Sequence, residues 1–238
     1  MKSKLSDICF YAKGKVNVSG LTDADYISTE NMLPNKGGIT TASSLPSTIQ
    51  TQAYKKDDIL VSNIRPYFKK IWFADFDGGC SNDVLVFRAK KGTDARFLYY
   101  VLADDAFFDY STATSKGTKM PRGDKTTIMQ YEVPHFDLPI QKKIAWILAD
   151  IDDKIALNSN INKNLEQQAV VLFRSWFTTF CLSSNKPRVN SEFGEIPEDF
   201  AVVKVGSLPM LVTDYVANGS FASLKANVSL YQEPNYAY

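Results

Sequence analysis

The sequence predicts an α+β fold: a mixed globular domain, then a long coiled-coil helix, then a short and incomplete C-terminal segment. Three observations support this prediction. Short apolar runs of strand length are separated by turn-forming residues early in the chain, and one segment of helical periodicity interrupts them. An apolar heptad repeat then continues with no proline or glycine between Pro139 and Pro187. We therefore expect three regions, residues 1–137, 138–182 and 183–238.

Four early segments have the length and the β-branched or aromatic content of strands. They are YISTENM, DILVSNI, KIWFA and DVLVFRA, which begin at Tyr26, Asp58, Lys70 and Asp83. Turn-formers such as PNKGG and DGG are expected to separate them. A further segment, DARFLYYVLADDAFFDYS, begins at Asp94 and has helical periodicity, with that aspartate ahead of it as a cap. Strands with an isolated helix indicate the α+β class.

The segment from Leu138 to Phe180 is predicted to be a single long helix. Asp137 can cap it, and Pro139 suits the first helical turn, where its missing N–H costs nothing. Seam residues then recur in alternating gaps of four and three, which is the repeat of a coiled coil rather than of a helix on a globular core. The predicted seam contains Ile144, Leu148, Ile151, Ile155, Asn158, Asn162, Leu165, Ala169, Leu172 and Trp176.

Two consecutive seam positions are occupied by Asn158 and Asn162. Buried asparagines lower stability but fix the register and the number of partner helices, because few alignments let the amides pair. The alternative is local fraying or a kink at the middle of the helix. Because one helix cannot bury this seam alone, we expect a homodimer, unless the rest of the chain folds back onto it.

Composition restricts the function. With 238 residues, 45% of them hydrophobic, and a net charge of +1, the chain can form a real core, and any basic partner surface must be local. Cys9, Cys80 and Cys181 have neither disulfide nor metal spacing, which favours reduced thiols and a cytoplasmic location. No signal peptide or membrane-spanning run is visible.

Signals of catalysis are weak in this sequence. No phosphate-binding glycine loop, zinc spacing or nucleophile elbow is found, so we expect no catalytic residue, no metal site and no bound cofactor. The single histidine, His135, is predicted to be structural. The adjacent acids Asp152 and Asp153 point in different directions on a helix and are interpreted as a solvated face.

Signals of binding are concentrated in two basic loops. NIRPYFKKIW, Asn63–Trp72, interleaves cations with aromatic rings, and SKGTKMPRGDK, Ser115–Lys125, carries four cations and one acid. Lysine and arginine neutralise phosphates, and arginine and asparagine can also read base edges. Solvated surface explains one such loop, but with two in one domain DNA binding is an equally good explanation. The candidate DNA contacts are Asn63, Arg65, Lys69, Lys70, Lys116, Thr118, Lys119 and Arg122.

Several of these segments resemble a known family. YISTENMLPNKGG, DILVSNIRPYFKKIWFA, GTKMPR and above all LPIQKKIAWILADIDDKIALNSNINKNLEQQAVVLFRSWF resemble the specificity subunit of type I restriction–modification systems. The resemblance covers residues 1–182, as a target-recognition domain plus a conserved helix. It continues through FGEIPEDFAVVKVGSL, which is similar to the linker and first strand of a second recognition domain.

The resemblance implies a non-catalytic subunit that recognises double-stranded DNA. It would bind half of a bipartite target and dock the methyltransferase (modification) subunit and, through it, the restriction subunit. Those partners would supply the S-adenosylmethionine, ATP and Mg²⁺ chemistry. The family has two recognition domains and two helices that pack antiparallel, so one of each implies a half-subunit that pairs two copies of its helix. The rival hypothesis is a structural coiled-coil protein whose head binds a protein or a glycan.

Overall fold

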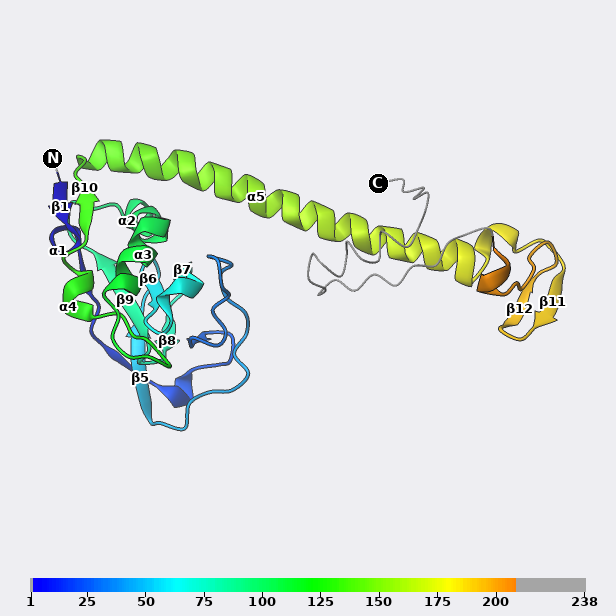
Figure 1. Cartoon of the computed structure of the whole chain (residues 1–238), viewed down its shortest axis with the longest axis horizontal. Coiled ribbons are helices and arrows are strands. Elements are labelled where there is room, and N and C mark those ends of the chain that lie inside the picture. The colour runs from blue at the N-terminus through cyan, green and yellow to red at the C-terminus, as the bar shows by residue number, and fades with distance from the viewer. Residues whose placement is uncertain (1, 209–238) are drawn as a thin grey trace, which may run out of the picture. The chain divides into compact units, whose positions relative to one another are not determined.

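The computed structural model describes residues 2–208 and confirms a mixed α+β fold with one long helix (Figure 1). The chain forms two compact units, Met1–Lys163 and Asn164–Tyr238. The first unit contains the strands that lie between Lys2 and Pro134 and the long helix as far as Lys163. None of the helices within residues 2–208 has the length and apolar character needed to cross a membrane.

The first unit is assembled from short strands and short helices. Its strands are β1 (Lys2–Lys4), β2 (Cys9–Tyr11), β3 (Lys15–Asn17), β4 (Tyr26–Ile27), β5 (Gln50–Tyr54), β6 (Ile59–Ser62), β7 (Ile71–Phe73), β8 (Gly78–Cys80), β9 (Val84–Ala89) and β10 (Glu132–Pro134). Its helices are α1 (Leu5–Ile8), α2 (Ala95–Ala103), α3 (Asp105–Ala113), α4 (Lys125–Ile128) and the start of α5 (Leu138–Phe173), with 3-10 turns at Val18–Gly20 and Pro66–Phe68.

These strands form two four-stranded sheets and a ribbon. One sheet has the order β2-β9-β6-β7 and is antiparallel throughout. The other has the order β3-β5-β8-β4, in which β4 and β8 run parallel. The ribbon pairs β1 with β10, so that the chain start lies beside the strand that leads into α5 (Figure 1).

The β2-β9-β6-β7 sheet is the middle layer, because both of its faces are covered. Ile59, Val61 and Phe87 point into a core shared with helices α2 and α3. Leu60 and Val86, which alternate with them, point into a second core shared with the other sheet. Alternating side chains of a strand face opposite ways, so β6 and β9 must be apolar on both sides. That is why these two strands could be recognised in the sequence.

Three of the four predicted strands are confirmed as β6, β7 and β9, whereas the first is shorter than predicted. Only Tyr26 and Ile27 form β4. The helical segment is interrupted at Asp104, which ends α2 and caps α3 by accepting a hydrogen bond from the Ala106 N–H at 3.1 Å. Asp94 caps α2 as predicted, accepting from the Phe97 N–H at 2.9 Å. Two aspartate caps in one segment thus give two helices.

The predicted DGG turn is wrong, because Gly78 and Gly79 lie inside strand β8. A Cβ at Gly78 would meet the carbonyl oxygen of Asp25 and would lie 2.5 Å from the Tyr54 hydroxyl. A Cβ at Gly79 would lie 2.5 Å from Leu21 Cδ1. Glycine is required here because neighbouring groups approach the strand backbone closely, not because the chain turns.

Replacing Gly78 by alanine is therefore expected to destabilise the first unit by about 1–3 kcal/mol, the usual cost of overpacking. Gly20→Ala is the matched control, since nothing lies within 4 Å of a Cβ at that position. The free energy of unfolding, measured with denaturant, checks both variants. Equal stability of the two variants would contradict the close approach described for β8.

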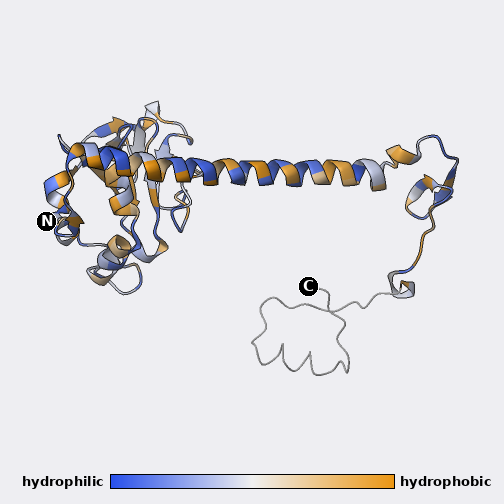
Figure 2. Ribbon diagram, turned by 90° about the horizontal axis from the view of Figure 1, so that it is seen from above, coloured by the Kyte–Doolittle hydropathy of each residue, from blue (hydrophilic) through white to orange (hydrophobic). Residues whose placement is uncertain are grey.

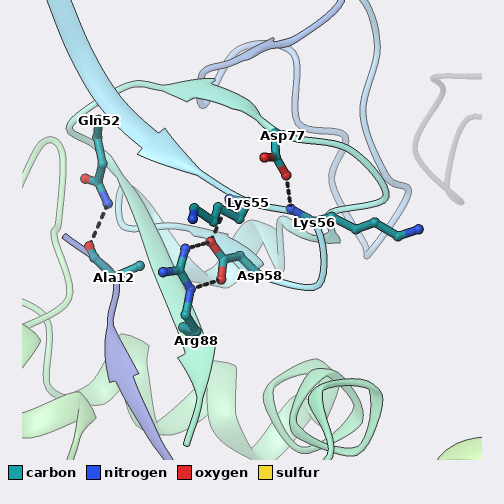
Figure 3. Close-up of polar contacts among 7 residues, drawn as sticks. All are labelled: Ala12, Gln52, Lys55, Lys56, Asp58, Asp77 and Arg88. Atoms are coloured by element: carbon teal, nitrogen blue, oxygen red, sulfur yellow. Dashed lines mark hydrogen bonds and ion pairs between the residues drawn. The ribbon is translucent and has the colours of Figure 1, made fainter. Parts of the chain in front are cut away.

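A half-buried ion pair joins β9 to the residue that precedes β6 (Figure 3). Arg88 donates from Nε and Nη2 to the two carboxylate oxygens of Asp58, each at 2.6 Å. The Asp58 side chain also accepts from the Lys55 N–H at 2.8 Å, and the residue is 1% exposed. The hydrogen bonds to Asp58 raise the pKa of the Arg88 guanidinium. A bidentate pair of this kind fixes the register of the two central strands.

Helix α5 is attached to the first unit along its first turns. The buried side chain of Gln141 donates to the Phe136 carbonyl at 2.8 Å and accepts from the Asp94 N–H at 2.9 Å. Ala145 is buried one turn later. The hydroxyl of Tyr100 then donates to Asp152 at 2.8 Å. Asp152 is thus an anchor to α2 rather than only part of the solvated face that the sequence predicts.

The predicted helix from Leu138 is confirmed, but its end differs from the prediction. The α-helix ends at Phe173 and is followed by one π-helical turn, Arg174–Thr178, and a 3-10 turn, Cys181–Ser183. A π turn is wider than an α turn, so the last predicted seam residue, Trp176, lies outside the regular heptad repeat. Figure 2 shows apolar and polar residues alternating along α5.

The second unit contains a hairpin after the helix, formed by β11 (Arg188–Ser191) and β12 (Gly194–Pro197). An ion pair between Lys186 and Asp199 closes its base. Residues 201–204 form no strand and are followed by a 3-10 turn, Val205–Ser207, so the strand expected there is not formed. Residues 209–238, the rest of the predicted third region, lie outside the described residues.

Candidate nucleic-acid interface

The two basic loops predicted from separate parts of the sequence lie against each other. They are the part of Asn63–Trp72 that precedes β7, residues 63–70 and here loop A, and residues 115–125, here loop B. Ile64 forms an antiparallel bridge with Arg122, and the Arg65 N–H donates to the Pro121 carbonyl at 2.8 Å. A third bond joins the Gly123 N–H to the carbonyl of Asn63, at 3.2 Å. Main-chain hydrogen bonds therefore make one surface of the two loops.

Loop A has an unusual backbone. Arg65 and Lys69 adopt left-handed conformations, with φ of 49° and 52°, on either side of the Pro66–Phe68 turn. Such angles are uncommon for residues other than glycine, and surrounding structure must maintain them. The result is a sharp bulge that exposes the rings of Tyr67 and Phe68, whose centroids are 4.8 Å apart. Exposed rings beside cations suit stacking against bases or sugars.

Loop B is held by ion pairs with aspartates. Arg122 donates to Asp83 from Nε at 3.1 Å, and Lys116 Nζ lies 2.5 Å from an Asp124 oxygen. The pKa of the Asp124 carboxyl lies below its usual range. The hydrogen bond from Lys116 contributes most to this shift, and the hydrogen bond from the Thr127 N–H contributes next. Asp83 also accepts the Asn63 N–H at its carbonyl, so it supports both loops. Asp83 is not among the predicted contacts, which were chosen as cations, an amide and a hydroxyl able to face DNA.

Two of the predicted contacts are tied back to the domain. Lys69 forms an ion pair with Asp105 at 3.0 Å, and Lys36 joins the same carboxylate at 2.8 Å. Lys70 Nζ donates to the Thr29 carbonyl at 2.6 Å, and desolvation lowers the pKa of its ammonium group. Both lysines therefore stabilise loop A as well as adding positive charge to it.

Asn63 is placed differently from a residue that reads bases. It is 7% exposed, and its side-chain carbonyl has no hydrogen-bond partner among the described residues. A Cβ at Gly123 would lie 3.0 Å from that oxygen, so glycine is needed where loop B crosses loop A. The geometry makes Asn63 a support for the junction and offers little of its surface to DNA.

The remaining predicted contacts are the ones that face solvent without a partner. Within residues 2–208, no side-chain hydrogen bond or ion pair engages Arg65, Thr118 or Lys119, and the last two are exposed. A cation without an internal partner can bind a phosphate without breaking an ion pair that stabilises the loop. Arg65 and Lys119 are thus the groups of this surface that are most available to phosphates or base edges.

The predicted seam of α5 has two parts. Ile144 and Leu148 are half-buried, because they line a pocket of about 220 Å³ together with Phe97 and Tyr100 of α2. Its own domain thus covers the start of the seam. From Ile151 onward the seam is exposed, and this part contains Ile151, Ile155, Asn158, Asn162, Leu165, Ala169, Leu172 and Trp176. A row of exposed isoleucines and leucines on one helix marks an interaction surface.

Other reactive groups of the described residues have structural surroundings. His135 shares a hydrogen bond with the Ser3 hydroxyl at 3.0 Å. Burial raises the pKa of the Cys9 and Cys80 thiols to about 12, which makes both unreactive. No group of three or more histidine, cysteine, aspartate or glutamate residues within residues 2–208 is arranged to hold a metal ion.

Several characterised proteins are similar to this chain. The family described as type I restriction modification DNA specificity domain matches residues 1–167. The HindI specificity subunit of Haemophilus influenzae is 31% identical over 187 residues, covering 74% of this chain and 40% of the relative. The EcoDI specificity subunit of Escherichia coli is 26% identical, covering 71% and 41%. The chain thus spans about two fifths of the length of these relatives.

Solved structures give the same match for the fold. The HsdS subunit from Thermoanaerobacter tengcongensis superposes with a TM-score of 0.54 at 18% identity, covering 74% of this chain and 47% of that one. The type I S subunit from M. genitalium superposes with a TM-score of 0.51 at 19% identity, covering 76% and 47%.

Proposed function

Because the chain belongs to the type I restriction modification DNA specificity family, we propose that it recognises DNA through loops A and B. The observation that carries the proposal is that these two basic loops are joined by main-chain hydrogen bonds and present free cations together. The domain of residues 1–137 would contact one half of a bipartite target. Phosphate contacts would position it, and Arg65 and Lys119 would be closest to the bases.

The chain would act without catalysis of its own, as the specificity component of a larger cytoplasmic assembly. The methyltransferase (modification) subunit would dock on it and would bring the restriction subunit. The HindI and EcoDI relatives, which are specificity subunits, support this role, and the chain spans about two fifths of their length. The rival function, a coiled-coil protein whose head binds a protein or a glycan, has no comparable observation in its favour.

A homodimer through α5 would supply the second half of the recognition unit. The exposed part of the seam, from Ile151 to Leu172, supports an antiparallel pair in which Asn158 and Asn162 of the two copies cross. Two identical domains related by a two-fold axis would read two identical half-sites in opposite orientations.

Co-expression with the modification subunit tests this function. We expect the two proteins to co-purify and the host DNA to be methylated at a bipartite site whose halves are inverted repeats. Sequencing of methylated positions provides the measurement, and the modification subunit expressed alone is the control. Methylation that is identical without this chain, or a site with two unrelated halves, would contradict the proposal.

A further inference from the structure

A basic cleft lies beside the two loops and was not predicted from the sequence. Its volume is about 450 Å³, and the turn between β2 and β3, strand β5 and the start of β9 form its walls. Three lysines line it, Lys13, Lys15 and Lys125, and no acidic residue does. Among residues 2–208, no hydrogen bond or ion pair engages the ammonium group of any of the three.

The walls of the cleft are fixed by hydrogen bonds that leave these ammonium groups free. The Tyr11 hydroxyl donates to the main-chain carbonyl of Lys125 at 3.0 Å, which ties the end of loop B to β2. Gln52 donates to the Ala12 carbonyl at 3.4 Å, across the base of the turn (Figure 3). Lys15 stands opposite Gln52 in the β3–β5 pair. The three lysines therefore belong to a concave surface whose main chain is held by hydrogen bonds.

The cleft is continuous with the surface of loops A and B. Lys125 is the last residue of loop B and also lines the cleft. Asn82 also lines the cleft, and the next residue, Asp83, holds Arg122 and accepts the Asn63 N–H. Loop B and the cleft thus share Lys125, and the carboxylate of Asp83 beside them is paired with Arg122.

We propose that this cleft holds the phosphate backbone of the DNA where it runs past loops A and B, with Lys13, Lys15 and Lys125 as phosphate contacts. The inference rests on the proposed function and adds a second contact region to it. Lysine suits this role because its ammonium is a point charge on a flexible stem, which follows a backbone without reading bases. The cleft would thus supply affinity, and the loops would supply sequence preference.

The test is the full chain carrying Lys13→Gln together with Lys15→Gln. Lys125 is kept, because it also belongs to loop B. Binding is measured at several salt concentrations, to a duplex containing the methylated site and to an unrelated duplex of equal length. Each lost phosphate contact lowers the slope of log affinity against log salt by about 0.9, so we expect the slope to fall by about 1.8. Both duplexes should lose affinity by the same factor.

Lys142→Gln with Lys143→Gln is the matched control. It removes the same charge from exposed residues of α5, which begins beside β1 and β10, away from β5 (Figure 1). The control should bind as the wild type does. A folded Lys13 and Lys15 variant with wild-type slope and affinity would overturn the cleft assignment and leave the proposed function intact. A wild-type chain that binds neither duplex would instead overturn the proposed function, and this inference with it.

A chemical readout separates DNA from a free anion. Acetylation of Lys13 and Lys15 is measured by mass spectrometry. The duplex should slow this acetylation, whereas inorganic phosphate at the same phosphate concentration should not. Equal protection by inorganic phosphate alone would show a free-anion site and overturn the assignment to the DNA backbone.

Discussion

Changing Ile151 and Leu165 to aspartate is expected to convert the proposed dimer into a monomer. Both side chains belong to the exposed part of the seam, with exposed fractions of 49% and 56%. Removing such a side chain from water stabilises an interface by about 1.5–3 kcal/mol. In the variant, each helix would instead bring two carboxylates into an apolar seam, and a buried unpaired carboxylate costs far more than the lost packing.

Val170→Asp with Val171→Asp is the control for this effect. These valines are also exposed, at 51% and 65%, but they follow seam residue Ala169 and lie on the outer side of the heptad. The control adds the same charge to the same helix and should remain dimeric. Sedimentation at micromolar concentration measures the mass of each variant. A wild-type protein of monomeric mass would contradict the proposed dimer and, with it, the proposed symmetric recognition of two DNA half-sites.

Reversing the charge at Arg65 and Lys119 together is expected to weaken DNA binding at least tenfold at moderate salt. These cations have no side-chain hydrogen bond or ion pair within residues 2–208, so their replacement by glutamate breaks no polar contact of a side chain. Each lost phosphate contact reduces the release of counterions, and each new carboxylate repels the DNA. Arg122 is left unchanged, because its reversal would place a carboxylate beside Asp83 and weaken loop B itself.

The control for this prediction reverses Lys142 and Lys143 to glutamate, an equal change in charge at exposed positions of α5. Fluorescence anisotropy with a labelled duplex measures both variants, and circular dichroism checks that they fold. Wild-type affinity in a folded Arg65 and Lys119 variant would remove the junction of the loops from the DNA interface. Loss of affinity in the control alone would move the interface to the helix.

The sequence revealed the strands of the fold that are apolar on both faces and missed those that are not. β6 and β9 were recognised because both of their faces are buried. β5, QTQAY, was missed because Thr51 and Tyr54 are its only fully buried side chains, and Gln50 and Gln52 interrupt any apolar run. β8 was predicted to be a turn because the sequence alone does not distinguish a glycine required by close packing from a glycine required by a turn.

The candidate site was predictable as two loops but not as one surface. Their junction depends on main-chain hydrogen bonds between residues almost sixty positions apart, such as Arg65 and Pro121, and main-chain bonds leave no signature in side-chain chemistry. Burial also distinguishes Asn63 from Lys119, although both are polar loop residues. The cleft was missed for a similar reason, since Lys13 and Lys15 come from a third segment without a charge run.

The attachment of α5 through Gln141 has a mechanical consequence. One side chain bonds both to the cap of α2 and to Phe136 in the loop between β10 and the helix, and Tyr100 holds Asp152 about three turns further on. The first turns of α5 cannot swivel on the domain without breaking these bonds. If DNA binds the domain as proposed, a rotation of the domain would therefore also rotate α5 from Gln141 to Asp152.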